Sequence, residues 1–132
     1  MANEFWINLP VRDLDKSRRF FTTIGFSLHP SYGESSEMAG LVMGEKGVMV
    51  MLFPEETFSQ FAHNEIADPL RGTEVLFSLD AESREEVDLM AERVVTAGGE
   101  TFGGPGEKNG MYGFGFTDPD GHRWNVITWE QG

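Results

Sequence analysis

Few side chains in this sequence can do acid–base chemistry in a pocket, and Glu74 is the foremost of them. It opens a segment, 74–79, in which Val75, Phe77 and Leu79 are apolar. Alternation along a strand places Glu74 on the side opposite those apolar residues, where a cleft would lie. A carboxylate there could act as a general base or pair with a cationic group of a ligand. The alternative is a residue at a strand end, exposed to water.

Asn8 and Asn125 are the polar residues that we expect near Glu74. Asn8 alternates with Trp6 along the segment 4–11, opposite an apolar side. Amide groups in a cleft orient ligands through hydrogen bonds. The competing interpretation is a pair of satisfied polar residues that joins two strands inside the core.

Methionine and aromatic residues supply the apolar part of the predicted site. Thioether and aromatic side chains suit an apolar or aromatic ligand, because they are adaptable or present large flat surfaces. A methionine-rich core explains the same residues equally well. The strand 48–53 is apolar on both sides, so one side is free to line the cleft. The predicted ligand-binding set is Trp6, Asn8, Met49, Met51, Glu74, Met111 and Asn125.

The histidines and the glycine-rich segment are interpreted as structural. His122 follows a DPDG turn and is separated from Asn125 by an odd number of residues, so it points to the other side of a strand. His29 and His63 occur in loop-like contexts and are expected at the surface. The segment 103–110 lacks the Lys-Ser/Thr ending of a phosphate-binding loop. We expect a mobile connection there, serving as a lid or as a hairpin.

Two similar series of elements must position these residues. In the first, a strand over 4–11 leads to a helix capped by Asp13 and ended by Gly25. Strands are predicted over 26–29, 38–43 and 48–53, followed by a short helix that starts at Pro54.

The second series begins about half the chain later, with Asp80 matching Asp13. A strand over 74–79 leads to a helix whose start has the capping-box pair Ser83 and Glu86. The last predicted strands are 111–117 and 122–129. The repeat predicts an α+β fold, one domain over 1–132, with two paired βαβββ modules (about 1–65 and 70–132) that form a curved mixed-sheet cleft.

Composition narrows the classes of function. The net charge is −12 and no basic cluster opposes it, so binding to nucleic acid is not expected. No apolar run approaches the length of a membrane span, so no membrane partner is expected. The sequence has no cysteine, which excludes disulfides and thiolate metal sites. With no visible signal peptide, these features favour the cytoplasm.

Three motifs resemble those of the vicinal oxygen chelate superfamily, which includes glyoxalase I, bleomycin and fosfomycin resistance proteins, and extradiol dioxygenases. They are 11–17 (VRDLDKS), Phe20-Phe21 to Gly25-Phe26, and 118–121 (DPDG). The resemblance covers nearly the whole chain. More narrowly, the chain is similar to short bacterial glyoxalase-like proteins. It implies two modules around a U-shaped pocket, and often a homodimer.

The resemblance also implies metal-ligand positions, and this chain departs from them. They fall at Trp6, about Met51, Glu74 and Asn125. Of these, Glu74 is a good ligand and Asn125 a weak one, whereas a divalent metal needs three or four nitrogen or oxygen ligands. A metal cofactor is therefore disfavoured, as are glyoxalase I and extradiol dioxygenase activities.

Three functions follow as hypotheses. The first is a glyoxalase- or bleomycin-resistance-like protein that binds a small apolar or aromatic molecule in a cleft with a degenerate metal site. The second is a lyase- or dioxygenase-type enzyme of the glyoxalase family that uses Glu74, with or without a metal. The third, less favoured, is an interaction module whose groove binds a protein partner.

Overall fold

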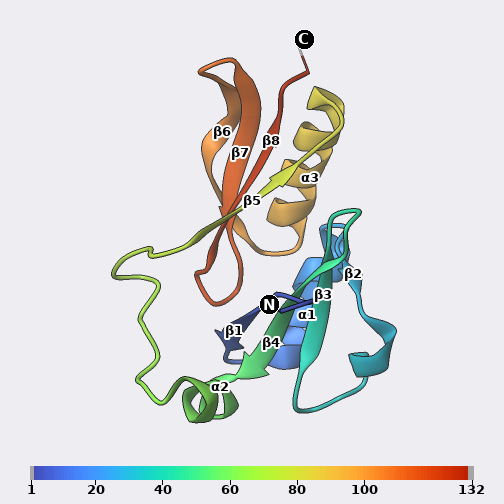
Figure 1. Ribbon diagram of the computed structural model, residues 1–132. Coiled ribbons are helices and arrows are strands. Elements are labelled where there is room, and N and C mark those ends of the chain that lie inside the picture. Colours follow the sequence, from blue (N-terminus) through green and yellow to red (C-terminus); the bar gives the residue numbers. More distant parts are fainter. Residues whose placement is uncertain (1, 131–132) are drawn as a thin grey trace. The chain divides into compact units, whose positions relative to one another are not determined.

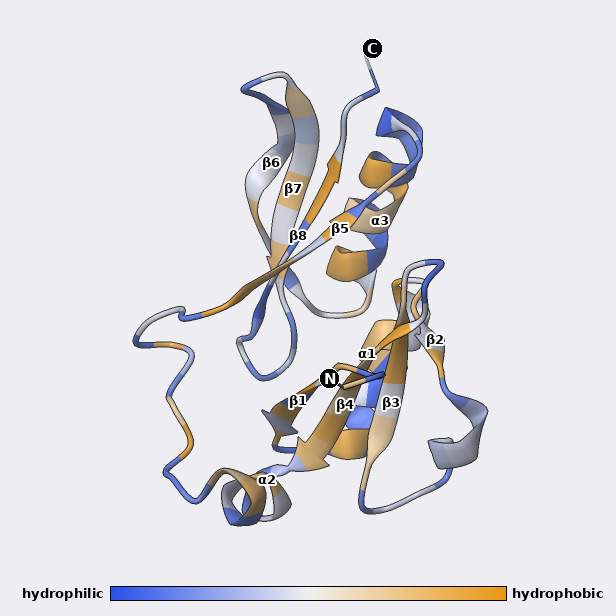
Figure 2. Ribbon diagram, viewed as in Figure 1, coloured by the Kyte–Doolittle hydropathy of each residue, from blue (hydrophilic) through white to orange (hydrophobic). Residues whose placement is uncertain are grey.

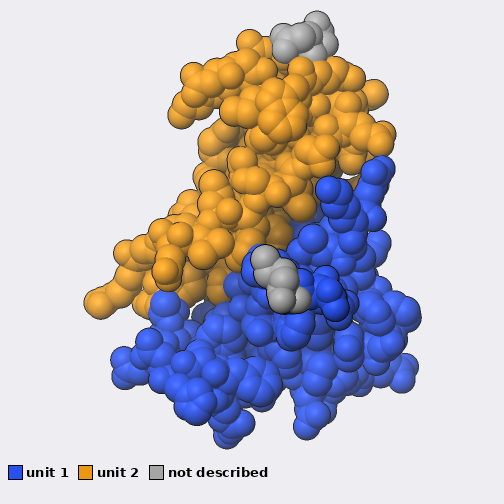
Figure 3. All heavy atoms as spheres, in the orientation of Figure 1, with its two compact units in different colours: residues 1–67 blue, residues 68–132 orange. Residues whose placement is uncertain are grey.

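The computed structural model describes residues 2–130, and the chain divides into two compact units, 1–67 and 68–132 (Figure 3). Each unit is a βαβββ module with its own four-stranded sheet, so the α+β fold expected from the repeat is confirmed. The module boundaries expected at about 65 and 70 stay a prediction. Among the described residues, no helix combines the length and apolar character needed to cross a membrane.

The first unit is built on one sheet with a long helix packed on one side of it (Figure 1). The strand order is β1-β4-β3-β2, with β1 parallel to β4 and the other pairs antiparallel. In chain order the elements are β1 (Trp6–Val11), α1 (Leu14–Thr23), β2 (Ser27–Leu28), the 3-10 helix η1 (Pro30–Tyr32), β3 (Ala39–Met43), β4 (Val48–Pro54) and α2 (Glu55–Ala62).

The core of the first unit lies between α1 and one side of this sheet. In β1 the residues Leu9 and Val11 are buried, and their partners on β4 include the fully buried Leu52. The helix contributes the expected apolar stripe, including Phe21, which is 1% exposed and packs against Phe26 with 5.4 Å between ring centroids. Because side chains alternate across a strand, β1 and β4 must present their remaining residues on the opposite side.

The second unit repeats this plan with a longer hairpin in place of the short β2 and β3 strands. Its strand order is β5-β8-β7-β6, with β5 parallel to β8, which matches the first unit pair by pair. The elements are β5 (Leu76–Asp80), α3 (Arg84–Thr96), β6 (Glu100–Lys108), β7 (Met111–Thr117) and β8 (Arg123–Thr128).

The core of the second unit is aromatic. Trp124 is 1% exposed, and its ring stacks on Phe116 with 6.1 Å between centroids. Phe114 follows the same alternation on β7, where apolar residues and glycines take turns; Figure 2 shows this alternation as bands of hydropathy. The side of the sheet away from α3 therefore carries the glycines of β7.

The helix caps correct the expected correspondence between the two halves. Asp13 caps α1, its carboxylate accepting the backbone N–H of Lys16 at 3.1 Å, as expected. The equivalent residue before α3 is Ser83, whose hydroxyl accepts the backbone N–H of Glu86 at 3.1 Å. Asp80, which the sequence pattern had matched to Asp13, is instead the last residue of β5. The match was wrong because a short connection separates β5 from its helix.

The capping box at α3 is formed with a shift of one residue. The Ser83 half is as expected, but the Glu86 carboxylate accepts the backbone N–H of Glu82, at 2.9 Å, rather than that of Ser83. Both contacts satisfy N–H groups that have no partner within the helix.

The glycine-rich segment forms a strand rather than the predicted mobile connection. Residues 100–108 are β6, which pairs with β7 and has an irregularity in register between Phe102 and Gly106. Asn109 and Gly110, both with positive φ, form the turn that joins β6 to β7 in a hairpin. Composition pointed to a loop because glycine is depleted in strands. Pairing with the long β7 supplies the ladder hydrogen bonds that the local sequence does not predict.

Candidate functional site

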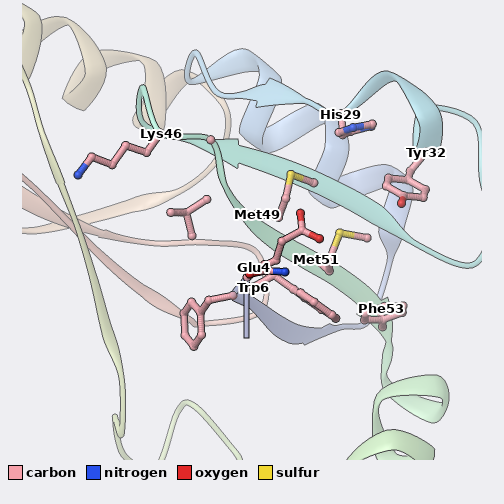
Figure 4. Close-up of a pocket in the computed structure, with 12 residues that line it drawn as sticks. Glu4, Trp6, His29, Tyr32, Lys46, Met49, Met51 and Phe53 are labelled. Atoms are coloured by element: carbon pink, nitrogen blue, oxygen red, sulfur yellow. The ribbon is translucent and has the colours of Figure 1, made fainter. Parts of the chain in front are cut away.

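A hollow of about 700 Å³ lies on the first unit, over the side of the sheet that faces away from α1 (Figure 4). Its lining is mainly apolar on the sheet itself and polar at the rim. The lining residues are Asn3, Glu4, Phe5, Trp6, His29, Tyr32, Lys46, Gly47, Val48, Met49, Met51 and Phe53.

Strand register explains why the floor of this hollow is apolar. Trp6 pairs with Met49, and the next pair on the same side is Asn8 with Met51. Residues that pair directly across a sheet share a side, so one row of β1 and one row of β4 form the floor. Trp6 is 55% exposed and Met51 8% exposed, so the floor includes both an open aromatic ring and a nearly covered thioether.

Gly40 on β3 makes room for the floor residues. It pairs with Met51, and a Cβ atom built on it would lie 2.6 Å from Met49 Cε and 3.2 Å from Met51 Sδ. The lack of a side chain at this position therefore lets both methionines lie across β3. A larger residue would push the Met49 terminus into the hollow.

His29 and Tyr32 form the aromatic rim on the far side of the methionines in Figure 4. Their ring centroids are 5.2 Å apart, and the backbone N–H of His29 donates to Gly40 O at 2.8 Å. His29 Nδ1 accepts the backbone N–H of Ser31 at 3.1 Å, so the neutral ring carries its proton on Nε2. The sequence analysis expected His29 at the surface. Its position directly after β2, and beside Gly40 on β3, brings it to the hollow.

Arg18 on α1 holds the segment that carries Tyr32. One guanidinium nitrogen, Nη2, donates to the backbone carbonyls of Tyr32 at 3.1 Å and Met38 at 2.8 Å, and also to that of Ser35. The other, Nη1, forms an ion pair with Asp15 at 3.0 Å. A planar fork of donors suits several carbonyls at once, which a lysine could not reproduce.

The corresponding side of the second sheet is polar. Asn125 Nδ2 donates to Ser78 Oγ at 3.4 Å, and these two residues are register partners on β8 and β5. Next to them Arg123 lies over the ring of Phe102, with 4.6 Å from the guanidinium carbon to the ring centroid. This side therefore offers hydrogen-bond donors and a positive charge in place of thioethers.

The predicted ligand-binding set is thus divided between the units. Trp6, Met49 and Met51 line the hollow, whereas Asn8 shares their side of the sheet without lining it. Met111 and Asn125 belong to the second unit. The predicted set leaves out the other lining residues, among them the titratable side chains of Glu4, His29, Tyr32 and Lys46.

Glu74 lies in the second unit, in a bend before β5, and is exposed. The strand begins at Leu76, two residues later than the alternation indicated. The residues of β5 on the side away from the helix are Leu76, Ser78 and Asp80, by their pairing with β8. The catalytic role of Glu74 stays a prediction.

The residues at the expected metal positions do not fit a divalent metal ion. Trp6 has no coordinating atom and Met51 offers a soft thioether. That leaves the Glu74 carboxylate and the Asn125 amide oxygen, fewer than the three or four nitrogen or oxygen ligands that a divalent metal needs. Among residues 2–130, no group of three or more histidine, cysteine, aspartate or glutamate side chains is placed to hold a metal.

The DPDG motif acts as a structural turn. One carboxylate oxygen of Asp118 accepts the backbone N–H groups of Asp120 and His122, each at 3.0 Å. The other accepts the indole N–H of Trp124 at 3.1 Å, and Gly121 adopts a φ of +90°. The turn thereby fixes the start of β8; a structural role for the His122 side chain stays a prediction.

Burial raises the pKa of Asp118 above its ordinary value. The positive charge of His122, and the hydrogen bonds from Trp124 and from the Asp120 backbone, act in the opposite direction. Burial has the larger effect because a charged carboxylate loses its hydration in the core.

Comparison with known proteins places the chain in a family. A sequence profile described as Glyoxalase/Bleomycin resistance protein/Dioxygenase superfamily matches residues 5–126. The chain belongs to this superfamily. No curated protein sequence matches it significantly.

Several solved structures resemble the chain over nearly its whole length. The hypothetical protein SA1046 from S. aureus is 31% identical, with a TM-score of 0.86, covering 97% of this chain and 95% of that one. A superfamily enzyme from Burkholderia phytofirmans is 20% identical, with a TM-score of 0.75 over 92% and 94% of the two chains.

Another solved structure with a similar fold is that of the fosfomycin resistance protein FosX from Listeria monocytogenes. It is 20% identical, with a TM-score of 0.69 over 98% of this chain and 93% of that one, and it was crystallised with Mn(II) and sulfate. At that identity the likeness shows a shared fold alone. The recognition made on the DPDG and VRDLDKS motifs is confirmed.

Proposed function

We propose that the protein binds a small apolar or aromatic molecule in the hollow of the first unit, without a resident metal. The observation that carries this proposal is the row of Trp6, Met49 and Met51 beneath a space of about 700 Å³. Small-molecule sites are typically concave and mainly apolar, of about 300–1,000 Å³, with few polar groups that set orientation. The polar atoms of the rim residues His29 and Tyr32 are suited to setting the orientation of a ligand.

The residue types also support binding without metal. FosX was crystallised with Mn(II), but of the four metal positions expected in this chain, Trp6, Met51, Glu74 and Asn125, one carries a good ligand, Glu74. Large flat and thioether side chains gain energy by covering apolar ligand surface rather than by coordinating an ion. Sequestration of the ligand is the activity that such a site supports directly.

The test uses N-phenyl-1-naphthylamine, an uncharged aromatic probe that fluoresces in apolar surroundings. We expect saturable binding with one probe per chain, unchanged by an excess of EDTA. Gly40→Val should weaken binding by about tenfold or more, because the new side chain drives Met49 into the hollow. The matched control is Gly72→Val, since nothing lies within 4 Å of a Cβ atom at Gly72.

Unsaturable probe binding, or binding that Gly40→Val leaves unchanged, would reject the hollow as the site. Loss of binding in EDTA would reject the metal-free part of the proposal. Circular dichroism of both glycine variants confirms that each is folded. Trp6→Ala provides a second variant that removes an aromatic wall without filling the space.

We also propose that the protein is a homodimer. Two large apolar side chains that line the hollow remain exposed, Phe5 at 75% and Trp6 at 55%. Exposed apolar patches of this kind mark interaction sites. Light scattering at micromolar concentration should report twice 14.8 kDa; a mass of one chain across a wide dilution series would contradict the proposal.

A further inference from the structure

Arg123 is a positive charge on an open sheet surface that no other described side chain neutralises. It starts β8 and pairs with Leu76 on β5 and Thr117 on β7, on the side away from α3. It is half-buried, and among residues 2–130 its side chain forms no ion pair or hydrogen bond; its guanidinium lies over the Phe102 ring. The chain has a net charge of −12, yet no acidic side chain among residues 2–130 forms an ion pair with Arg123.

Two strands on one side of β8, β7 and then β6, together hold the Arg123 side chain flat. Phe102 on β6 pairs with Gly115 on β7, and a Cβ atom on Gly115 would lie 2.2 to 2.5 Å from three carbons of the Phe102 ring. The glycine thus lets the ring lie against β7, where it forms a shelf for the guanidinium 4.6 Å from its centroid. Stacking on a ring occupies one flat side of a guanidinium and leaves its N–H donors free at the edge.

Two further polar groups lie on the same side of the sheet. Asn125 is two residues beyond Arg123 on β8, so both side chains point the same way. Its amide donates to Ser78 Oγ at 3.4 Å, at the long end of hydrogen-bond distances. The surface therefore combines a fixed guanidinium with an amide and a hydroxyl that have hydrogen-bonding capacity to spare.

We propose that this surface binds the carboxylate group of a small organic acid, with Arg123 as the charge and Asn125 as a second donor. A guanidinium fork matches the two oxygens of a carboxylate, and charge-assisted pairs of this kind are the strong ones. The Phe102 ring holds the fork in one orientation before the ligand arrives, which lowers the entropy lost on binding. The site lies wholly within residues 68–132 and does not rest on the hollow of the first unit.

The experiment titrates isotope-labelled protein with benzoate, and with benzamide as its uncharged counterpart, by NMR. Benzoate should shift the Asn125 side-chain amide and the Arg123 Nε–H in a saturable way, and benzamide should bind at least about tenfold more weakly. Arg123→Gln should weaken benzoate binding by about tenfold or more. The matched control is Arg93→Gln, which removes the same charge from the exposed surface of α3 and should leave benzoate binding unchanged.

Phe102→Leu separates positioning from charge. It keeps Arg123 but removes the shelf, so benzoate binding should weaken by a few-fold, less than in Arg123→Gln. Equal binding of benzoate by wild type and Arg123→Gln would overturn the proposal, as would equal binding of benzamide and benzoate. Binding of N-phenyl-1-naphthylamine should not change in Arg123→Gln, so failure of this site and failure of the hollow are distinguished.

Discussion

The two units share one topology and differ in the open sides of their sheets. Both pair a first strand parallel to a last one, and both bury the opposite side of the sheet under a helix. The first open side carries Trp6, Met49 and Met51, whereas the second carries Arg123 and Asn125 at the same kind of position. The buried sides thus define the module, and the open sides are free to differ in chemistry.

This difference explains why the family is easy to recognise and its ligand is not. The VRDLDKS motif holds the cap and first turn of α1, and the DPDG motif holds the turn into β8. Both motifs stabilise the frame. None of the residues that line the hollow falls within them. Motifs that are needed by any member of the fold carry little information about what a particular member binds.

The largest expected effect tests whether the buried side of the first sheet carries its stability. Phe21→Ala should lower the free energy of unfolding by about 3–5 kcal/mol, because the ring is 1% exposed and its loss leaves a cavity. Trp6→Ala, on the open side of the same sheet, should cost about 1 kcal/mol or less. Urea unfolding followed by circular dichroism measures both; equal costs would show that the open side is also core.

A smaller effect is expected at the turn that orders the second sheet. Asp118→Asn should cost about 1–3 kcal/mol at pH 7, since the amide NH₂ must face either the Trp124 indole N–H or two backbone N–H groups. Asp68→Asn is the control, because Asp68 accepts one backbone N–H, from Leu70, in an exposed turn that asparagine can reproduce.

The same variant has an expected pH dependence. Burial raises the pKa of Asp118 in the folded protein above its unfolded value, so folding favours the protonated form. Its contribution to stability is complete below the unfolded pKa and is lost as the pH rises through the folded pKa. The difference between wild type and Asp118→Asn should therefore be larger at pH 4 than at pH 7 in urea unfolding. A smaller difference at pH 4 would mean that the hydrogen bonds lower this pKa.

The smallest effect tests the equivalence of the two helix caps. Asp13→Ala and Ser83→Ala should each cost about 1 kcal/mol, because each side chain accepts the N–H three residues ahead. The costs should add in the double variant, since the two caps share no partner. Glu92→Ala, on the exposed surface of α3, should change stability by less than about 0.5 kcal/mol. Unequal cap costs would show that the modules differ in their frames as well as in their open sides.

Local patterns in the sequence were sufficient to predict much of the βαβββ framework. Alternation predicted the sides of β1, and the Asp13 and Ser83 signals predicted where the helices begin, because caps and periodicity depend on residues a few positions apart. The same reasoning failed at β6 and at the start of β5. A glycine-rich strand forms through pairing with a partner strand, and an isolated segment does not reveal that partner.

The sites were decided by tertiary structure. The sequence alone established which residues could be ligand-binding, and it selected Trp6, Met49 and Met51 for their chemistry. It could not bring His29 and Tyr32 to the same hollow, because that depends on the pairing of β2, β3 and β4 and on the Arg18 contacts to the segment between them. Residue type sets what a side chain can do, and long-range strand pairing sets which side chains do it together.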